Sequence, residues 1–279
     1  MKISAGRLLK RALNEKRAIP AINVSSIESI HAVFEAAAEV NSEVIIETST
    51  GESKHLHPEV LDAICQKLGE ILNVDYVLHM DRCGDLEWIE KVLKAGYNSV
   101  SAEFKNVDPE ENIELSKRAR KLCNEYNAAL EGVADVVPLV YYAEDKRQVD
   151  TDPGYAEKFV SEVQCDSLVI SVGTQSGRYK SKSGIKTNLL SEIHRRLPQM
   201  PLVLHGGSFL PEKIVKRAVE YGVAKINVNS ELRIAYTDKL KSNIDANPDE
   251  YAPYRLLKGV TDEMKKVVLN KFIIMRNEK

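Results

Sequence analysis

Residues 79–82 place an imidazole, a carboxylate and a guanidinium close together, as His79, Asp81 and Arg82. They follow an apolar run and precede Gly84, so they stand where a buried strand ends and the chain turns. A carboxylate in such a place transfers a proton or binds a metal ion. A guanidinium does neither in the same way, because it keeps its positive charge and has no lone pair to donate. The pattern therefore indicates a site that binds a metal ion or moves a proton, beside a fixed positive charge at Arg82.

Two turns rich in small polar residues favour an anion site. Segment 202–213 (LVLHGGSFLPEK) and segment 225–232 (KINVNSEL) each pass from an apolar strand into a helix. Backbone N–H groups and a helix N-terminus bind phosphate in such turns. Alone, the first is equally well an ordinary glycine-rich turn, and the second a simple N-cap. Together they favour phosphate binding, and segment 173–182 (GTQSGRYKSK) adds a turn followed by basic residues.

The elements that must position these groups alternate regularly along the chain. Eight short apolar segments, each typical of a strand buried on both faces, are separated by amphipathic helical patterns. The predicted strands are 18–23, 43–47, 76–80, 99–103, 128–133, 167–172, 202–205 and 225–228. Eight βα units in about 250 residues predict an α/β protein with a (β/α)8 TIM barrel. A doubly wound open sheet is the competing fold, but no glycine-rich fingerprint follows the first strand.

A barrel places its catalytic groups at the C-terminal ends of the strands, where the βα loops build the active site. The polar residues at these ends include Asn23, Glu47, His79, Asp81, Arg82, Glu103, Lys105, Glu131, His205, Asn227 and Asn229. This set is too polar to serve only as helix caps. We therefore expect one site at the barrel mouth, built from residues far apart in the sequence.

Composition narrows the class of protein. The chain has 279 residues, 43% of them hydrophobic, and a net charge of −2, which favours neither nucleic acid nor an acidic membrane as a partner. Its four cysteines form no CxxC pair, as expected of reduced thiols in a cytoplasmic protein. The N-terminus has the pattern of an amphipathic helix and no signal-peptide core. We expect one barrel domain over 1–279, with a helical extension at about 250–279.

Several ordered segments are similar to a known family. They include AIPAINV (18–24), EVIIETSTG (43–51), LHMD (78–81), DSLVISVGT (166–174), VLHGGS (203–208) and KINVNSEL (225–232). With these segments the chain resembles the class II, metal-dependent ketose-bisphosphate aldolases, especially those acting on fructose and tagatose bisphosphates. The resemblance implies a barrel, a homodimer or homotetramer, and cleavage or formation of a C–C bond beside a dihydroxyacetone-phosphate unit.

The catalytic pattern departs from that family at its metal site. The resemblance implies one zinc ion held by three histidines, but Arg82 stands in place of the first and Ser176 in place of the second. Only the third, His205, is present. Catalytic zinc needs about three protein ligands and an open position. We therefore expect no zinc at the family position and no other cofactor.

These observations lead to a working hypothesis of an aldolase-type lyase that acts on a phosphorylated ketose without a metal. Asp81 would be the acid/base, Arg82 would stabilise a developing oxyanion, and His205 would give polar support. Lys105 would add positive charge or form a Schiff base, although a surface role is a strong alternative for it. The predicted substrate- and phosphate-binding residues are Asn23, Gly177, Gly206, Gly207, Ser208, Asn227, Asn229 and Ser230.

Two alternatives stay open. The first is another reaction on a sugar phosphate, such as isomerisation or a transaldol-type transfer. The second is a non-catalytic homologue that binds a sugar phosphate.

Overall fold

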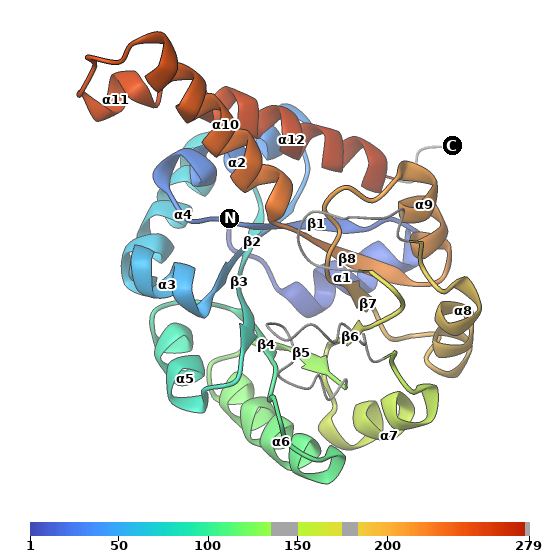
Figure 1. Ribbon diagram of the computed structural model, residues 1–279. Coiled ribbons are helices and arrows are strands. Elements are labelled where there is room, and N and C mark those ends of the chain that lie inside the picture. The colour runs from blue at the N-terminus through green and yellow to red at the C-terminus, as the bar shows by residue number, and fades with distance from the viewer. Residues whose placement is uncertain (135–149, 175–183, 277–279) are drawn as a thin grey trace.

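The computed structural model describes residues 1–134, 150–174 and 184–276. It contains a closed barrel of parallel strands in the order β1 to β8, with helices around the outside (Figure 1). The strands are β1 Ile19–Asn23, β2 Val44–Ser49, β3 Tyr76–Cys83, β4 Ser99–Ala102, β5 Ala129–Val133, β6 Ser167–Ile170, β7 Leu202–Leu204 and β8 Val223–Val228. Because β1 pairs with β8, the sheet has no free edge. This confirms the predicted TIM barrel over the open sheet.

Helices alternate with the strands as the sequence pattern predicts. Their bounds are α1 Ala5–Asn14, α2 Ile27–Glu39, α3 Thr50–Leu56, α4 Pro58–Leu72, α5 Leu86–Lys94, α6 Pro109–Glu125, α7 Pro153–Val163, α8 Thr187–Arg196, α9 Glu212–Glu220, α10 Ser230–Ala246, α11 Pro253–Leu256 and α12 Val260–Met275. Helix α6 shows why they begin where they do. The side chain of Asp108 accepts a hydrogen bond from the N–H of Glu111, and Pro109 occupies the first turn.

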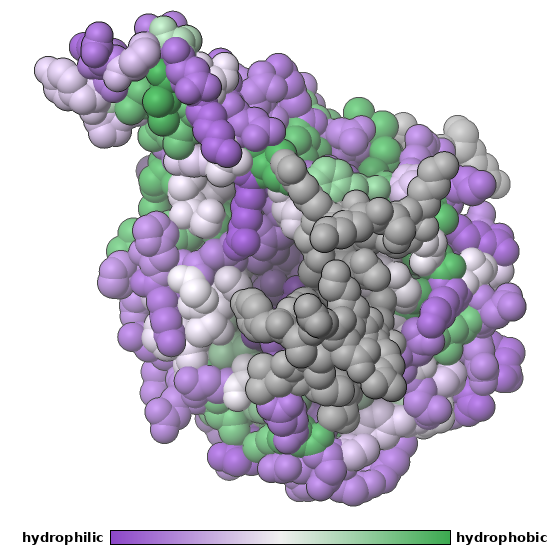
Figure 2. All heavy atoms as spheres, viewed as in Figure 1, coloured by the Kyte–Doolittle hydropathy of each residue, from purple (hydrophilic) through white to green (hydrophobic). Residues whose placement is uncertain are grey.

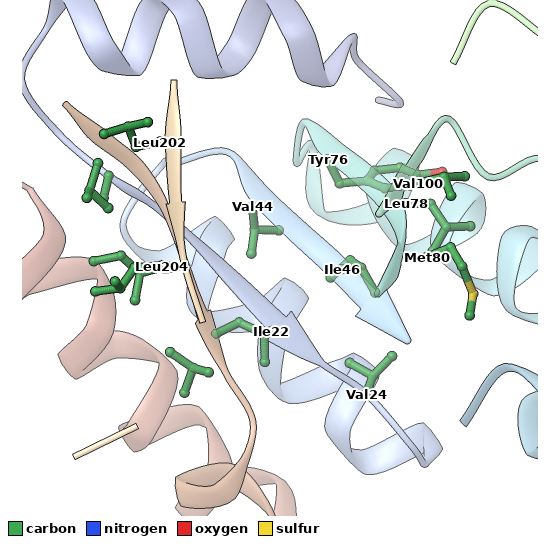
Figure 3. Close-up of a cluster of buried hydrophobic side chains, with 14 of the residues drawn as sticks. Ile22, Val24, Val44, Ile46, Tyr76, Leu78, Met80, Val100, Leu202 and Leu204 are labelled. Atoms are coloured by element: carbon green, nitrogen blue, oxygen red, sulfur yellow. The ribbon is translucent and has the colours of Figure 1, made fainter. Parts of the chain in front are cut away.

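Two apolar layers hold the barrel together. On the outside, side chains such as Ile22, Ile46 and Leu78 pack beneath the helices (Figure 3). On the inside, alternate residues such as Ile45 and Val77 pack against α1, which closes the N-terminal end of the barrel. Each fully buried aliphatic side chain of this kind contributes about 1.5–3 kcal/mol.

The inside of the barrel changes from apolar to polar along each strand. Since successive residues of a strand face opposite sides, the inward positions after Ile45 and Val77 are Glu47 and His79. Asp81 is the next inward position of β3 and pairs with Ser49 of β2. The apolar floor next to α1 therefore supports a polar layer toward the C-terminal ends of the strands.

The C-terminal helices form an outer layer and an arm. Helix α12 packs against α2 and α10, whereas α11 and the end of α10 extend away from the barrel (Figure 1). Within the parts of the chain that the structure describes, we find no helix with the length and apolar character needed to cross a membrane.

Candidate active site at the barrel mouth

Asp81 lies at the centre of the mouth, buried and held by two amides. Asn23 Nδ2 of β1 donates to Asp81 Oδ2 at 3.3 Å, and Asn227 Nδ2 of β8 donates to Asp81 Oδ1 at 3.4 Å. Burial raises the pKa of Asp81, but the charge of the Arg82 guanidinium lowers it. Charges at His205 and Lys225 act in the same direction as Arg82, and the resulting pKa of Asp81 lies below its usual range. Asp81 is therefore a carboxylate at neutral pH.

Arg82 is held beside this carboxylate by an unusual backbone. Its φ of 50° lies in the left-handed region, and the pairing of β3 with β4 shifts register between Met80 and Cys83. The sequence predicts that this strand ends at Met80, but β3 continues to Cys83, where the N–H of Glu103 donates to the carbonyl of Cys83 at 3.0 Å. The side chain of Arg82 is 29% exposed, with Nε 3.7 Å from Asp81 Oδ1. Strained backbone of this kind concentrates at functional sites.

Below Asp81 the barrel contains a cluster of buried charges. Lys225 Nζ lies 2.7 Å from Glu131 Oε2 and 3.4 Å from Glu47 Oε2. The same Nζ is 3.1 Å from His79 Nε2, and His79 Nδ1 is 2.8 Å from Ser99 Oγ. The sequence places Glu47, His79 and Glu131 among the polar residues at strand ends, but it does not predict that they meet at Lys225.

The two carboxyl groups of this cluster have pKa values shifted in opposite directions. Burial raises the pKa of Glu131, but Lys225 and then His79 outweigh burial and hold that pKa well below its usual range. Burial raises the pKa of Glu47 well above its usual range, and Lys225 only partly offsets this. Burial lowers the pKa of Lys225, but the charges of Glu131 and Glu47 raise it by more, so the pKa of Lys225 lies above its usual value. At neutral pH Glu131 is ionised and Lys225 is an ammonium ion with no nucleophilic lone pair, while Glu47 binds a proton more readily than Glu131 does.

His205 connects this cluster to the mouth. Its Nε2 lies 3.5 Å from Glu131 Oε1, and its side chain is partly exposed. Its carbonyl accepts a hydrogen bond of 2.8 Å from Thr174 Oγ1, which ties β7 to the loop after β6. His205 can therefore contact both a ligand in the mouth and the buried carboxylate beneath it.

The two predicted phosphate turns form one continuous wall. The N–H of Gly207 donates to the carbonyl of Asn227 at 2.9 Å, and the N–H of Asn229 donates to Ser208 Oγ at 3.3 Å. A Cβ at Gly207 would lie 2.2 Å from Ile226 Cγ2, so only glycine allows this close approach. Helix α10 begins at Ser230, directly beside the joined turns. Its N-terminus carries partial positive charge toward the mouth.

The remaining predicted residues are placed less centrally. Lys105 is 41% exposed, with Nζ 3.6 Å from Glu103 Oε2. It thus lacks the water-excluded surroundings that activate a lysine nucleophile. Gly177, predicted to bind phosphate, and Ser176, in place of a zinc ligand, lie outside the described residues.

The donors at the mouth do not fit a catalytic zinc ion. Arg82 offers positive charge where a lone pair is required. The nearest carboxylate to His205 is Glu131, which already pairs with the Lys225 ammonium group. Among residues 1–134, 150–174 and 184–276, no three histidine, cysteine or acidic side chains group as a metal site would require.

The mouth remains strongly polar. Figure 2 shows hydrophilic residues in the hollow on this face of the barrel. Taken together, the site can remove a proton through Asp81 and stabilise negative charge through Arg82, and it presents a wall suited to an anion.

Comparisons with known proteins agree with this architecture. The family model described as class-II fructose-bisphosphate aldolase matches residues 3–279. The structure of the YdjI aldolase from Escherichia coli K12 superposes with a TM-score of 0.83 at 26% identity, covering 99% of this chain and 97% of that one. The fructose-bisphosphate aldolase of Campylobacter jejuni shares the fold, with a TM-score of 0.82 at 23% identity and coverage of 98% and 95%. The chain belongs to the class II fructose-bisphosphate aldolase family.

Proposed function

We propose that this protein is an aldolase-type lyase that cleaves or forms a C–C bond in a phosphorylated ketose, without zinc at the family position. Family membership supports the lyase reaction. One observation supports the metal-free form of this reaction. An ionised Asp81 is fixed by two amides, and the Arg82 guanidinium lies 3.7 Å from it, where a metal ligand would stand.

In the cleavage direction, Asp81 acts as the base. Its carboxylate takes the proton of the substrate hydroxyl at the carbon that becomes the aldehyde. The C–C bond then breaks, and its electron pair moves onto the ketone to give an enediolate. Arg82 stabilises the negative charge of this enediolate, a role that needs positive charge but no lone pair. Asp81 then releases its proton to water, and water supplies one proton to the enediolate carbon. The carboxylate of Asp81 is thereby restored.

The anion wall holds the phosphate of the ketose. Its residues are Gly206, Gly207, Ser208, Asn227, Asn229 and Ser230, with Asn23 on the neighbouring strand β1 and Gly177 a further candidate. The hydrogen bonds from the N–H groups of Gly207 and Asn229 fix the shape of this wall, and the partial positive charge at the adjoining N-terminus of α10 supports the proposal.

The assembly that we propose is a homodimer or homotetramer. The arm of α10 and α11 extends away from the barrel (Figure 1). Tyr251 and Tyr254, which belong to this arm, are 89% and 72% exposed. Exposed aromatic side chains are typical of protein contacts, and a second copy of this chain is the partner that we propose for them. A cytoplasmic location is supported by Cys65, Cys83, Cys123 and Cys165, which are buried and unpaired.

Steady-state kinetics on a panel of ketose mono- and bisphosphates tests the reaction. We expect turnover of at least one of them, and a loss of about 100-fold or more in kcat for Arg82→Gln. Asp81→Asn should reduce kcat at least as far, while Glu59→Gln on the exposed start of α4 should have no effect. Thermal stabilisation by dihydroxyacetone phosphate with no turnover of any ketose would instead favour the non-catalytic homologue. A variant Arg82→Gln with full activity would refute the role of the guanidinium.

A further inference from the structure

A chain of hydrogen bonds connects the start of α10 to the carboxylate of Asp81. It runs from Arg233 of α10 to Glu52 of α3, then to Asn23 of β1, and then to Asp81 of β3. We propose that Glu52 is a positioning residue. It fixes the acid/base carboxylate of Asp81 through Asn23, and it fixes the position of that carboxylate relative to the anion wall through Arg233. This inference rests on the proposed function, because it assigns Asp81 and α10 the roles given there.

Glu52 is buried, and its carboxylate is fully engaged. Its Oε2 accepts hydrogen bonds from the backbone N–H of Ser49 at 2.7 Å, from Ser49 Oγ at 2.8 Å and from Asn23 Nδ2 at 3.2 Å. Its Oε1 accepts from Arg233 Nη2 at 2.6 Å. Four donors from three separate segments therefore converge on one carboxylate.

Capping of α3 explains only part of this arrangement. The capping box needs the contacts between Ser49 and Glu52, and these two residues provide them. The bonds to Asn23 and Arg233 are not required for a cap. They lead toward the site, and they add to the stabilisation that a buried carboxylate requires.

Asn23 passes the constraint from Glu52 to Asp81. An amide nitrogen carries two hydrogens, and those of Asn23 point to Glu52 at 3.2 Å and to Asp81 at 3.3 Å. The side chain therefore cannot rotate without losing both bonds to carboxylates. Because charged acceptors strengthen such bonds, both ends hold the amide in one orientation.

Arg233 connects the same carboxylate to the phosphate wall. It lies one turn beyond Ser230, so its ion pair with Glu52 fixes the first turn of α10 against α3. Glu52 thus contacts both the helix that follows the phosphate turn and the amide that holds the acid/base carboxylate. The distance between phosphate and reacting carbon is set in part by this link, and small errors in such positioning reduce kcat strongly.

Kinetics of Glu52→Gln tests the inference. The amide keeps the size of the side chain but removes the charge and one acceptor. We expect kcat to fall about tenfold or more, with KM changed less than about twofold, because the phosphate turns themselves are intact. The control Glu59→Gln should match the wild type. An unchanged kcat in a folded Glu52→Gln variant would overturn the inference.

A double-mutant cycle distinguishes positioning from a purely structural role. If Glu52 acts through Asn23, then Glu52→Gln should cause a smaller loss of kcat in the Asn23→Ala background than in the wild type. Losses that multiply fully would show that Glu52 acts by another route and would overturn the inference.

An NMR measurement on the side-chain amide of Asn23 tests the inference independently of turnover. The side-chain amide resonance of Asn23 is identified by its absence from spectra of Asn23→Ala. We expect Glu52→Gln and Asp81→Asn each to move it, and Glu59→Gln to leave it in place. A resonance unaffected by Glu52→Gln would overturn the inference. If the resonance moves as expected but the wild type cleaves no ketose, the proposed function fails and the positioning of Asp81 by Glu52 stands.

Discussion

Replacement of Lys225 by methionine tests whether the barrel interior depends on one ammonium group. Lys225 is buried, and its Nζ lies 2.7 Å from Glu131 Oε2 and 3.4 Å from Glu47 Oε2. Lys225→Met leaves Glu131 as a buried carboxylate without its closest cation. Breaking a buried ion pair on one side reduces the free energy of unfolding by about 3–5 kcal/mol. At about 2 °C per kcal/mol for a chain of this size, the melting temperature should fall by about 6–10 °C.

Urea unfolding at pH 7 and one fixed protein concentration measures this loss. The control is the double variant Lys225→Met with Glu131→Gln, which removes the uncompensated charge and should recover a substantial part of the lost stability. A loss below about 1 kcal/mol for Lys225→Met would show that water or rearrangement compensates the charge, and it would refute the account of the cluster.

Three further predictions concern other parts of the molecule. Glu47 faces Lys225, Glu131 and Asp81, and its pKa is raised in the folded protein, so folding favours its protonated form. Its contribution to the free energy of unfolding is therefore complete below its pKa in the unfolded chain, and it is lost as the pH rises through its pKa in the folded protein. Glu47→Gln should therefore gain stability relative to the wild type as the pH rises above about 4.5 in urea unfolding, and a constant difference would contradict this. Gly207→Ala should weaken binding of inorganic phosphate by calorimetry about tenfold or more, because its Cβ would meet Ile226 Cγ2 at 2.2 Å, whereas Gly51→Ala has nothing within 4 Å and should bind normally. Tyr254→Glu should lower the molar mass measured by light scattering if the arm binds a second copy, and an unchanged mass would exclude this contact.

The fold was predictable because its signal is local and repeated. Each strand is a short apolar run, and helix starts such as Asp108-Pro109 follow known capping rules. The end of β3 was not predictable, because it depends on a register shift and on the left-handed φ of Arg82. Propensity within one segment carries no information on such pairing.

The site was only partly predictable for a related reason. Asp81, Arg82 and His205 stand at strand ends, so the barrel pattern alone brings them to one mouth. The bond between Glu52 and Arg233 joins residues that are 181 positions apart, and nothing in either segment indicates the other. The buried pairing of Lys225 likewise depends on inward side chains of three strands meeting at one height in the barrel.

We propose that the guanidinium of Arg82 replaces a metal ion in this protein. This proposal is tested most directly by measuring bound zinc in the purified wild-type protein together with its cleavage of a ketose phosphate in excess chelator. We predict zinc far below one ion per chain and undiminished cleavage, because Arg82 supplies the positive charge. One zinc ion per chain, with activity lost in chelator and restored by added zinc, would contradict the account.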